Sequence, residues 1–212
     1  MGAVVRGGGT AYPSRMGDAA KARRTDAELR AALEALPEGQ KGEILDGELY
    51  VQPRPRSRHA RVNVSFAAQI GRVVDDFDAT GSGSWIILVE PGIELPGAPE
   101  VAPDLAGWRR DRFEWPDDEP IRVVPDWVCE ILSPSTLRVD RMKKMPIYAR
   151  ERVPHVWLVD PRERTVEVFR FGDPRYTLIG TFGGDDALVA EPFDATPIPP
   201  AFLWGAKAPV GG

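Results

Sequence analysis

The chain has 212 residues, of which 42% are hydrophobic and 28% charged, a balance typical of one folded domain with its own core. Its formal net charge of −5 argues against broad, nonspecific wrapping of nucleic acid, which needs a basic face, but leaves room for a local basic groove. The single cysteine, Cys129, excludes an intrachain disulfide and a zinc site built from several cysteines.

The ends and the overall hydropathy favour a cytoplasmic chain. No stretch approaches the roughly 18 apolar residues of a membrane span, and the N-terminus lacks the apolar core of a signal peptide. Residues 1–24 are rich in Gly, Ala and Arg without an apolar period, so we expect a flexible tail there. A single domain is expected over residues 25–205.

The first elements are a helix and a hairpin. A threonine N-cap, an acidic first turn, leucines at helical spacing and a closing proline predict a helix over 25–37. In GEILDGELYVQP, Asp46-Gly47 between apolar residues predicts a hairpin with strands at 42–45 and 48–52.

The middle of the chain contains one long helix and two strands. Apolar residues at three- and four-residue steps predict a helix over 57–77. Strands are expected at 85–94, with a bend at Pro91-Gly92, and at 101–107, where Asp104 follows a proline. Charged residues at 109–120 predict a loop or a short, weak helix.

The last part of the chain predicts a crossover. The expected elements are a strand at 127–132, a helix at 137–151 capped by Thr136, a strand at 155–159, and a hairpin of strands at 165–171 and 176–182. A helical crossover of this length suits parallel or mixed pairing of the strands that it joins. The predicted fold is therefore mixed α/β, a mixed β-sheet flanked by helices with an N-terminal β-hairpin.

Several common catalytic motifs are missing from the sequence. The glycines near the N-terminus lack the strand and helix of a phosphate-binding loop, and no Gly-x-Ser-x-Gly elbow occurs. Cys129 lies inside an apolar strand, where a buried small hydrophobic role is expected.

Glu130 is the most informative acidic residue. It lies mid-strand among apolar residues, where a charge is costly to bury unless it is paired or binds a metal. The alternative is an edge strand with Glu130 facing water. Strand alternation puts Asp126 on the same face, but four residues of strand span about 13 Å, too far for a shared cation. Asp104, on a neighbouring strand, is the better partner.

The predicted helix at 137–151 contains a polar stripe. Asp140, Lys144 and Tyr148 follow one another at four-residue steps and so share a face. One interpretation is an Asp–Lys pair that only stabilises the helix, with Tyr148 in the core. In the other interpretation the stripe faces the end of the glutamate strand, where its lysine would reach a metal-bound water or a phosphate oxygen.

Two clusters of basic residues interrupt the acidic chain, one at 54–61 and one at 138–144. Each is either a solvated face or a set of phosphate contacts. His59 is more often a cap or surface residue in such a position, although a place in the site is open to it.

The block PDWVCEILSPSTLRVDRMKKMPIYARERVPHVWLVDP resembles the Uma-two family of restriction endonucleases, part of the PD-(D/E)XK nuclease superfamily. GEILDGELYVQP resembles the hairpin of that family, His59 a histidine that opens its first long helix, and PDLAG at 103–107 its aspartate strand. The resemblance covers roughly residues 40–200 and implies a restriction-endonuclease-like core.

The resemblance also implies roles for single residues. Asp104 and Glu130 would bind Mg²⁺ or Mn²⁺. The motif lysine would be Lys144, because the usual position two residues after the glutamate holds Leu132. Glu43 is the candidate for an additional catalytic acid, with Glu48 as its rival.

The implied activity is metal-dependent endonucleolytic hydrolysis of phosphodiester bonds, with DNA as the expected substrate and a homodimer by family analogy. The expected nucleic-acid contacts are Arg56, Arg58, His59, Arg141 and Lys143. The alternative is a module that keeps the fold, binds nucleic acid or a protein, and has little catalysis.

Overall fold

The computed structural model describes residues 24–53, 57–74, 85–117, 120–184, 186–195, 197–199 and Trp204. The expected N-terminal tail, Arg24 apart, lies outside the described residues, as does Arg56. At residues 57–61 only the helical backbone is described, so the side chains of Arg58 and His59 also lie outside.

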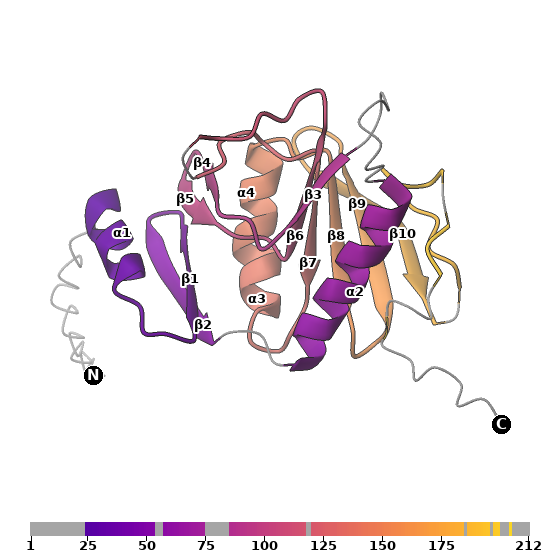
Figure 1. The fold of residues 1–212 in the computed structure, drawn as a ribbon, viewed down its shortest axis with the longest axis horizontal. Coiled ribbons are helices and arrows are strands. Elements are labelled where there is room, and N and C mark those ends of the chain that lie inside the picture. Colours follow the sequence, from indigo (N-terminus) through magenta and orange to yellow (C-terminus); the bar gives the residue numbers. More distant parts are fainter. Residues whose placement is uncertain are drawn as a thin grey trace, which may run out of the picture.

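Three helical regions and two β-sheets make up the described fold (Figure 1). The elements in chain order are α1 (Asp26–Glu34), β1 (Gln40–Leu45), β2 (Glu48–Pro53), α2 (Ser57–Val74), β3 (Trp85–Val89), β4 (Ile93–Leu95), β5 (Ala98–Val101), β6 (Leu105–Arg109), β7 (Trp127–Ile131), α3 (Leu137–Val139), η1 (Asp140–Lys144), α4 (Met145–Arg150), β8 (His155–Asp160), β9 (Thr165–Phe171) and β10 (Tyr176–Gly183). The predicted mixed α/β class is confirmed.

The larger sheet has the strand order β10-β9-β8-β7-β6-β3. Strands β7 and β8 pair in parallel, and their other neighbours in this sheet pair antiparallel. The helical segment from α3 to α4 joins the parallel pair, as the crossover length predicted. Because β7 lies inside the sheet, the edge-strand interpretation of Glu130 is wrong.

The smaller sheet has the order β2-β1-β5-β4 and begins with the predicted hairpin. Both turn residues have positive φ, 50° at Asp46 and 76° at Gly47. A two-residue turn of this kind matches the twist of paired strands, and aspartate and glycine tolerate it best. Thr25 caps α1 through a reciprocal hydrogen-bond pair with Glu28, which confirms the predicted helix start.

Apolar layers cover both faces of the larger sheet. On one face, α2 and the segment around Phe193 pack against Trp127, Cys129 and Ile131. On the other, α4 and the smaller sheet pack against Val128 and its neighbours. The alternation of β7 therefore directs its even-numbered residues, Glu130 included, toward α4 and the smaller sheet.

Two predicted strands are divided differently in the structure. Residues 85–94 form β3 and β4, and residues 98–109 form β5 and β6, so each segment contributes to both sheets. The chain bends at Glu90, whose φ is 48°, and again near Pro103, which has no N–H for a strand ladder. Asp104 therefore lies in a bend before β6, and the prediction that placed it within a strand is wrong.

The predicted helix over 137–151 is present, but its middle turn is a π-helix, η1. Thr136 occupies the predicted N-cap position, but its side chain makes no capping hydrogen bond, so the predicted capping interaction is wrong. Its hydroxyl accepts instead from the backbone N–H of Ser133 at 3.2 Å. No helix in the described ranges is long and apolar enough to span a membrane.

Candidate active site

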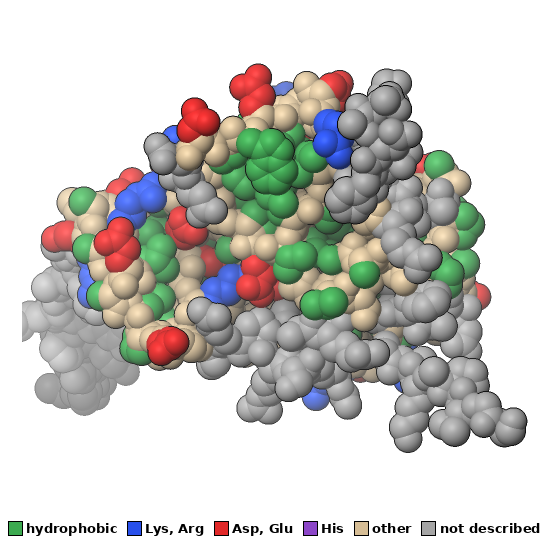
Figure 2. All heavy atoms as spheres, in the orientation of Figure 1, with side chains coloured by type: hydrophobic (Ala, Val, Ile, Leu, Met, Phe, Trp, Pro, Cys, Tyr) green, Lys and Arg blue, Asp and Glu red, His purple; other side chains and the backbone are tan. Residues whose placement is uncertain are grey.

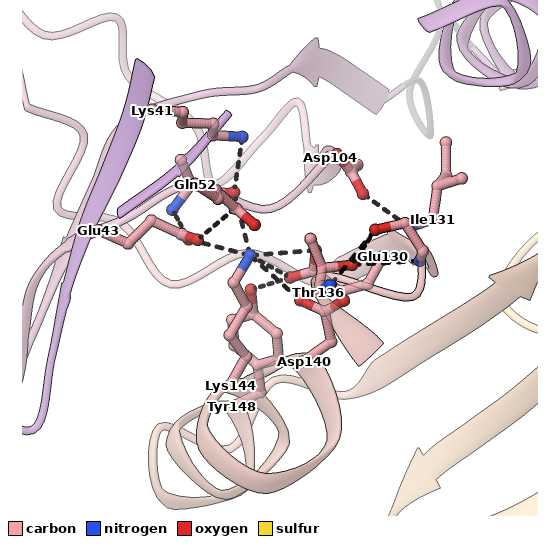
Figure 3. Close-up of polar contacts among 12 residues, drawn as sticks. Lys41, Glu43, Gln52, Asp104, Glu130, Ile131, Thr136, Asp140, Lys144 and Tyr148 are labelled. Atoms are coloured by element: carbon pink, nitrogen blue, oxygen red, sulfur yellow. Dashed lines mark hydrogen bonds and ion pairs between the residues drawn. The ribbon is translucent and has the colours of Figure 1, made fainter. Parts of the chain in front are cut away.

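Acidic side chains converge on one lysine where the two sheets meet (Figure 3). The members are buried and come from β1, the bend before β6, β7 and η1: Glu43, Asp104, Glu130, Asp140 and Lys144. We call this set the acidic cluster. Figure 2 shows basic and acidic side chains next to one another near the centre of one face, between the smaller sheet and the larger one.

Lys144 lies at the centre of the acidic cluster. Its Nζ is 2.9 Å from Oε1 of Glu43, 3.2 Å from Oε1 of Glu130 and 3.7 Å from Oδ1 of Asp140. It also donates to the carbonyl oxygen of Ala102 at 3.3 Å. Burial alone would lower the pKa of Lys144, but the surrounding carboxylates outweigh it and raise this pKa well above its ordinary value.

The predicted pair of Asp140 and Lys144 is present at 3.7 Å, and it is buried, since both side chains are 3% exposed. The four-residue spacing did predict the shared face correctly. The whole stripe points inward, toward the end of β7.

Glu130 is held by two donors. The hydroxyl of Tyr148 donates to its Oε1 at 2.6 Å, and Lys144 donates to its Oε2 at 3.2 Å. Burial raises the pKa of Glu130 to about 8, although the positive charge of Lys144 opposes that rise. Added positive charge near this buried carboxyl group would stabilise its ionised form.

Asp104 lies next to Glu130 through the backbone. Its Oδ2 accepts a hydrogen bond of 2.7 Å from the N–H of Ile131, the residue that follows Glu130. The carboxyl group of Asp104 is thus fixed at the end of β7, although it comes from a bend and not from a strand. The sequence predicted this neighbourhood, and it is present.

Glu43, and not Glu48, lies in the cluster. Its Oε1 accepts from the N–H of Ala102 at 2.8 Å and contacts Lys144. The side chain of Glu48 is 65% exposed and lies 3.7 Å from Lys143. In the hairpin register Glu43 is opposite Tyr50 and Glu48 is opposite Leu45, so both glutamates lie on one face of the hairpin. They differ in their position along it, because Glu48 lies next to the turn whereas Glu43 lies further along the strand, beside Ala102.

Asp140 is a member of the cluster that was not among the predicted site residues, although it belongs to the predicted stripe. It is buried, and its Oδ2 has no hydrogen-bond partner within the described part of the chain. Burial raises the pKa of Asp140 to about 6, against the opposing effect of Lys144. The four-residue spacing between Asp140 and Lys144 could have indicated that Asp140 lies on the same helix face as the lysine.

The donor set fits a hard divalent cation. Among the described residues the cluster contains four carboxyl groups and one ammonium group, so positive charge is in deficit, and the Oδ2 of Asp140 has no partner. Carboxylate oxygens are the ligands that Mg²⁺ prefers, usually one or two of them with water and substrate phosphate. No three His, Cys, Asp or Glu side chains in the described ranges form a ready-made metal cage.

Other candidates lie elsewhere. Asp126 lies directly before β7, accepts from the N–H of Arg109 and pairs with Arg112. Cys129 is fully buried, and burial raises the pKa of its thiol well above the ordinary value.

The two described basic candidates do not contact the cluster through any observed ion pair. Arg141 pairs with Glu167, and Lys143 lies 3.7 Å from Glu48 and 5.7 Å from the centre of the Tyr50 ring. The remaining predicted nucleic-acid contacts lie outside the described residues or side chains: Arg56, Arg58 and His59.

Two further polar groups lie at the cluster without having been predicted as site residues. Tyr148 lies in the core, as predicted, and its hydroxyl also donates to Glu130. Lys41 was not singled out, yet it donates to the carbonyl oxygen of Ala102 at 3.3 Å. Its position two residues before Glu43 on one strand could have indicated a shared face.

Comparisons with known proteins agree with this fold. The model of the Uma2 family, described as "Putative restriction endonuclease", matches residues 28–196. A crystal structure titled as a putative nuclease belonging to DUF820 from Anabaena variabilis superposes with a TM-score of 0.66 at 20% identity, covering 84% of this chain and 97% of that one. None of the curated proteins compared with the chain gives a significant match.

Proposed function

This chain belongs to the Uma2 family, and from that membership and the buried acidic cluster we propose that it is a metal-dependent nuclease that hydrolyses phosphodiester bonds in DNA. The observation that carries the proposal is the convergence of Glu43, Asp104, Glu130 and Lys144 from separate elements at one buried point. A purely structural ion pair does not require this excess of acid, because burying each further carboxylate is costly.

Asp104 and Glu130 would hold the cation, with Mg²⁺ as the expected ion and Mn²⁺ as a substitute. A cation bound there polarises a phosphodiester and lowers the pKa of an attacking water. Its positive charge would also favour the ionised form of Glu130, whose pKa burial raises to about 8.

The protein's own groups have separate tasks in this proposal. Lys144 offsets negative charge that develops on the phosphate and orients the attacking water. Tyr148 holds Glu130 in position through its hydroxyl. Glu43 fixes the ammonium group of Lys144 at 2.9 Å and so sets the direction of that side chain.

We also propose that the basic residues predicted from the sequence contact the nucleic-acid backbone. The proposed contacts are Arg56, Arg58, His59, Arg141 and Lys143. We further propose a homodimer, since two subunits can cut two strands, and a single domain over residues 25–205.

A second candidate function is a binding module with little catalysis. The observation in its favour is that Lys144 already bridges Glu43 and Glu130, so its ammonium group satisfies both carboxylates without a metal ion. Metal binding separates the two functions, because the module needs no cation.

The proposal is tested first by calorimetric titration of Mg²⁺ and Mn²⁺. Wild type should bind a cation, and Glu130→Gln should bind it at least about tenfold more weakly because a ligand oxygen is lost. Glu94→Gln is the control, since this partly exposed glutamate pairs with Arg30 and Arg122 away from the cluster. Absence of binding to wild type would contradict the nuclease proposal.

Catalysis is tested with plasmid DNA and Mn²⁺. Lys144→Ala should lower the cleavage rate about 100-fold, because the group that offsets developing charge is removed. Equal cleavage by wild type and Lys144→Ala would assign the activity to another site or to a contaminant.

A further inference from the structure

A second lysine lies at the rim of the acidic cluster. Lys41 and Glu43 are two residues apart on β1 and so share a face of the strand. Figure 3 shows Lys41 reaching from β1 toward the region that also receives Lys144. Nothing in the family comparison or in the proposed catalytic set assigns a task to Lys41.

Both lysines donate to one oxygen atom. Nζ of Lys41 and Nζ of Lys144 each lie 3.3 Å from the carbonyl oxygen of Ala102. The two ammonium groups can therefore be no further apart than twice that distance. The backbone N–H of Ala102 also donates to Glu43, so the backbone of this residue connects Lys41 to the acidic cluster.

The two lysines differ in their access to solvent. The side chain of Lys144 is 3% exposed, whereas that of Lys41 is 17% exposed. A polyanion that approaches the cluster meets four buried carboxylates, which repel it unless cations lie at the entrance. Of the two lysines that share the carbonyl oxygen of Ala102, Lys41 is the one more exposed to solvent.

The ion pair between Lys41 and its acidic partner, Glu90, is weak. Nζ of Lys41 is 3.8 Å from Oε1 of Glu90, whose side chain is 37% exposed, and pairs of this kind contribute little to stability. Glu90 has φ 48°, a left-handed conformation that non-glycine residues rarely adopt, and its N–H donates to the carbonyl oxygen of Asp104 at 3.0 Å. Glu90 is thus fixed beside Asp104.

Building on the proposed nuclease function, we propose that Lys41 binds a backbone phosphate of the nucleic-acid substrate at the rim of the cluster, and that Glu90 competes with this phosphate for its ammonium group. The two members of one ion pair then have opposite effects on substrate binding. A pair with a merely structural task would give effects of the same sign, because loss of either partner breaks it.

The test measures binding of a fluorescent 20-base-pair DNA duplex to the full chain in Ca²⁺, by anisotropy at several salt concentrations. Lys41→Met should weaken binding about tenfold and reduce the slope of log affinity against log salt by about one, as expected for one lost phosphate contact. Lys41→Arg should keep most of the affinity. Glu90→Gln should tighten binding about two- to threefold, since the phosphate no longer has a competitor.

The matched controls come from a second ion pair. Arg122 and Glu94 lie 2.9 Å apart on the smaller-sheet side, so Arg122→Met and Glu94→Gln make the same charge changes away from the rim. Both should bind DNA within about twofold of wild type, because a single charge away from the contact is screened by salt and acts only weakly. Thermal unfolding of every variant identifies one that fails to fold, and Glu90→Gln then still carries the test.

The outcomes separate the two proposals. If Lys41→Met binds like wild type, or if Glu90→Gln weakens binding as Lys41→Met does, the Lys41 proposal is overturned whether or not wild type cuts DNA. If the predicted binding pattern is found but wild type does not cut DNA with Mn²⁺, the Lys41 proposal stands and the catalytic proposal fails. If wild type binds no duplex at all, both are overturned.

Discussion

At the scale of single residues, burial controls the charge states of the acidic cluster. Glu130 is buried at the centre of a sheet, and burial raises its pKa to about 8 although Lys144 lies 3.2 Å away. The unfolded chain has the ordinary value of 4.5. Between these two values the folded state holds a proton that the unfolded state has lost.

This difference makes the stability of the metal-free protein depend on pH. Because the folded state binds more protons, the free energy of unfolding should fall as pH rises from 6 to 8.5, by at most about 1.4 kcal/mol per pH unit. Glu130→Gln should flatten this slope in urea titrations with EDTA, and the raised pKa of Lys144 adds no slope in this window.

Added Mg²⁺ should also flatten the slope in wild type, because a cation favours the ionised carboxylate. Equal slopes for wild type and Glu130→Gln without metal would show that Glu130 does not carry the effect. Asp140, whose pKa burial raises to about 6, contributes mainly below this window.

At the scale of elements, the π-helical turn η1 directs Lys144 into the cluster. The N–H of Met145 donates to the carbonyl oxygen of Asp140, five residues back, instead of four. Pro146 follows at once, and a proline in a helix lacks the N–H for the usual bond and presses against the carbonyl four residues earlier. A wider turn before Pro146 relieves that contact, and such turns recur at functional sites.

Pro146→Ala should therefore restore α-helical bonding and raise the free energy of unfolding by about 1 kcal/mol or more. The same change should lower the rate of plasmid cleavage about tenfold, since the ammonium group of Lys144 is re-aimed. Urea unfolding and the cleavage assay measure the two effects. Met142→Ala, at a 66% exposed position in the same turn, is the control. Unchanged cleavage by Pro146→Ala would show that the turn does not position the lysine.

At the scale of the whole molecule, the acidic cluster connects two sheets. Glu43 belongs to the smaller sheet, whereas Glu130 belongs to the larger one and Lys144 to the crossover helix. The chain also passes between the sheets twice, at β3–β4 and at β5–β6. Both features favour one cooperative unit, in keeping with the proposed single domain.

Tryptophan fluorescence and far-ultraviolet circular dichroism should therefore give the same unfolding midpoint for wild type. Glu43→Ala should lower the free energy of unfolding by about 1–3 kcal/mol, because the N–H of Ala102 loses its buried acceptor. Amide exchange should then accelerate in β1 and β2 before it does in β7 and β8. Glu48→Ala, at an exposed position of the same hairpin, serves as the control. Two separate transitions in wild type would contradict the single unit.

Local patterns in the sequence were sufficient for most of the elements. The Asp46-Gly47 turn, the alternation of β7 and the crossover helix follow from short-range chemistry, so hairpin, strand faces and parallel pairing were predicted correctly. The division of residues 85–94 and 98–109 between two sheets was not predicted, because strand propensity does not determine which neighbour a strand pairs with.

The sequence by itself indicated that Glu130 needs a partner and that Asp104 is a candidate, through an acid in an apolar strand, and the resemblance of the 125–161 block to a known family added Lys144. Only the tertiary structure decided that Glu43 completes the cluster in place of Glu48, that Asp140 and Tyr148 face Glu130 and Lys144, and that Lys41 lies at the rim. The physical reason is that burial and charge pairing depend on which elements pack together, and contacts between β1, β7 and η1 join residues far apart in the chain.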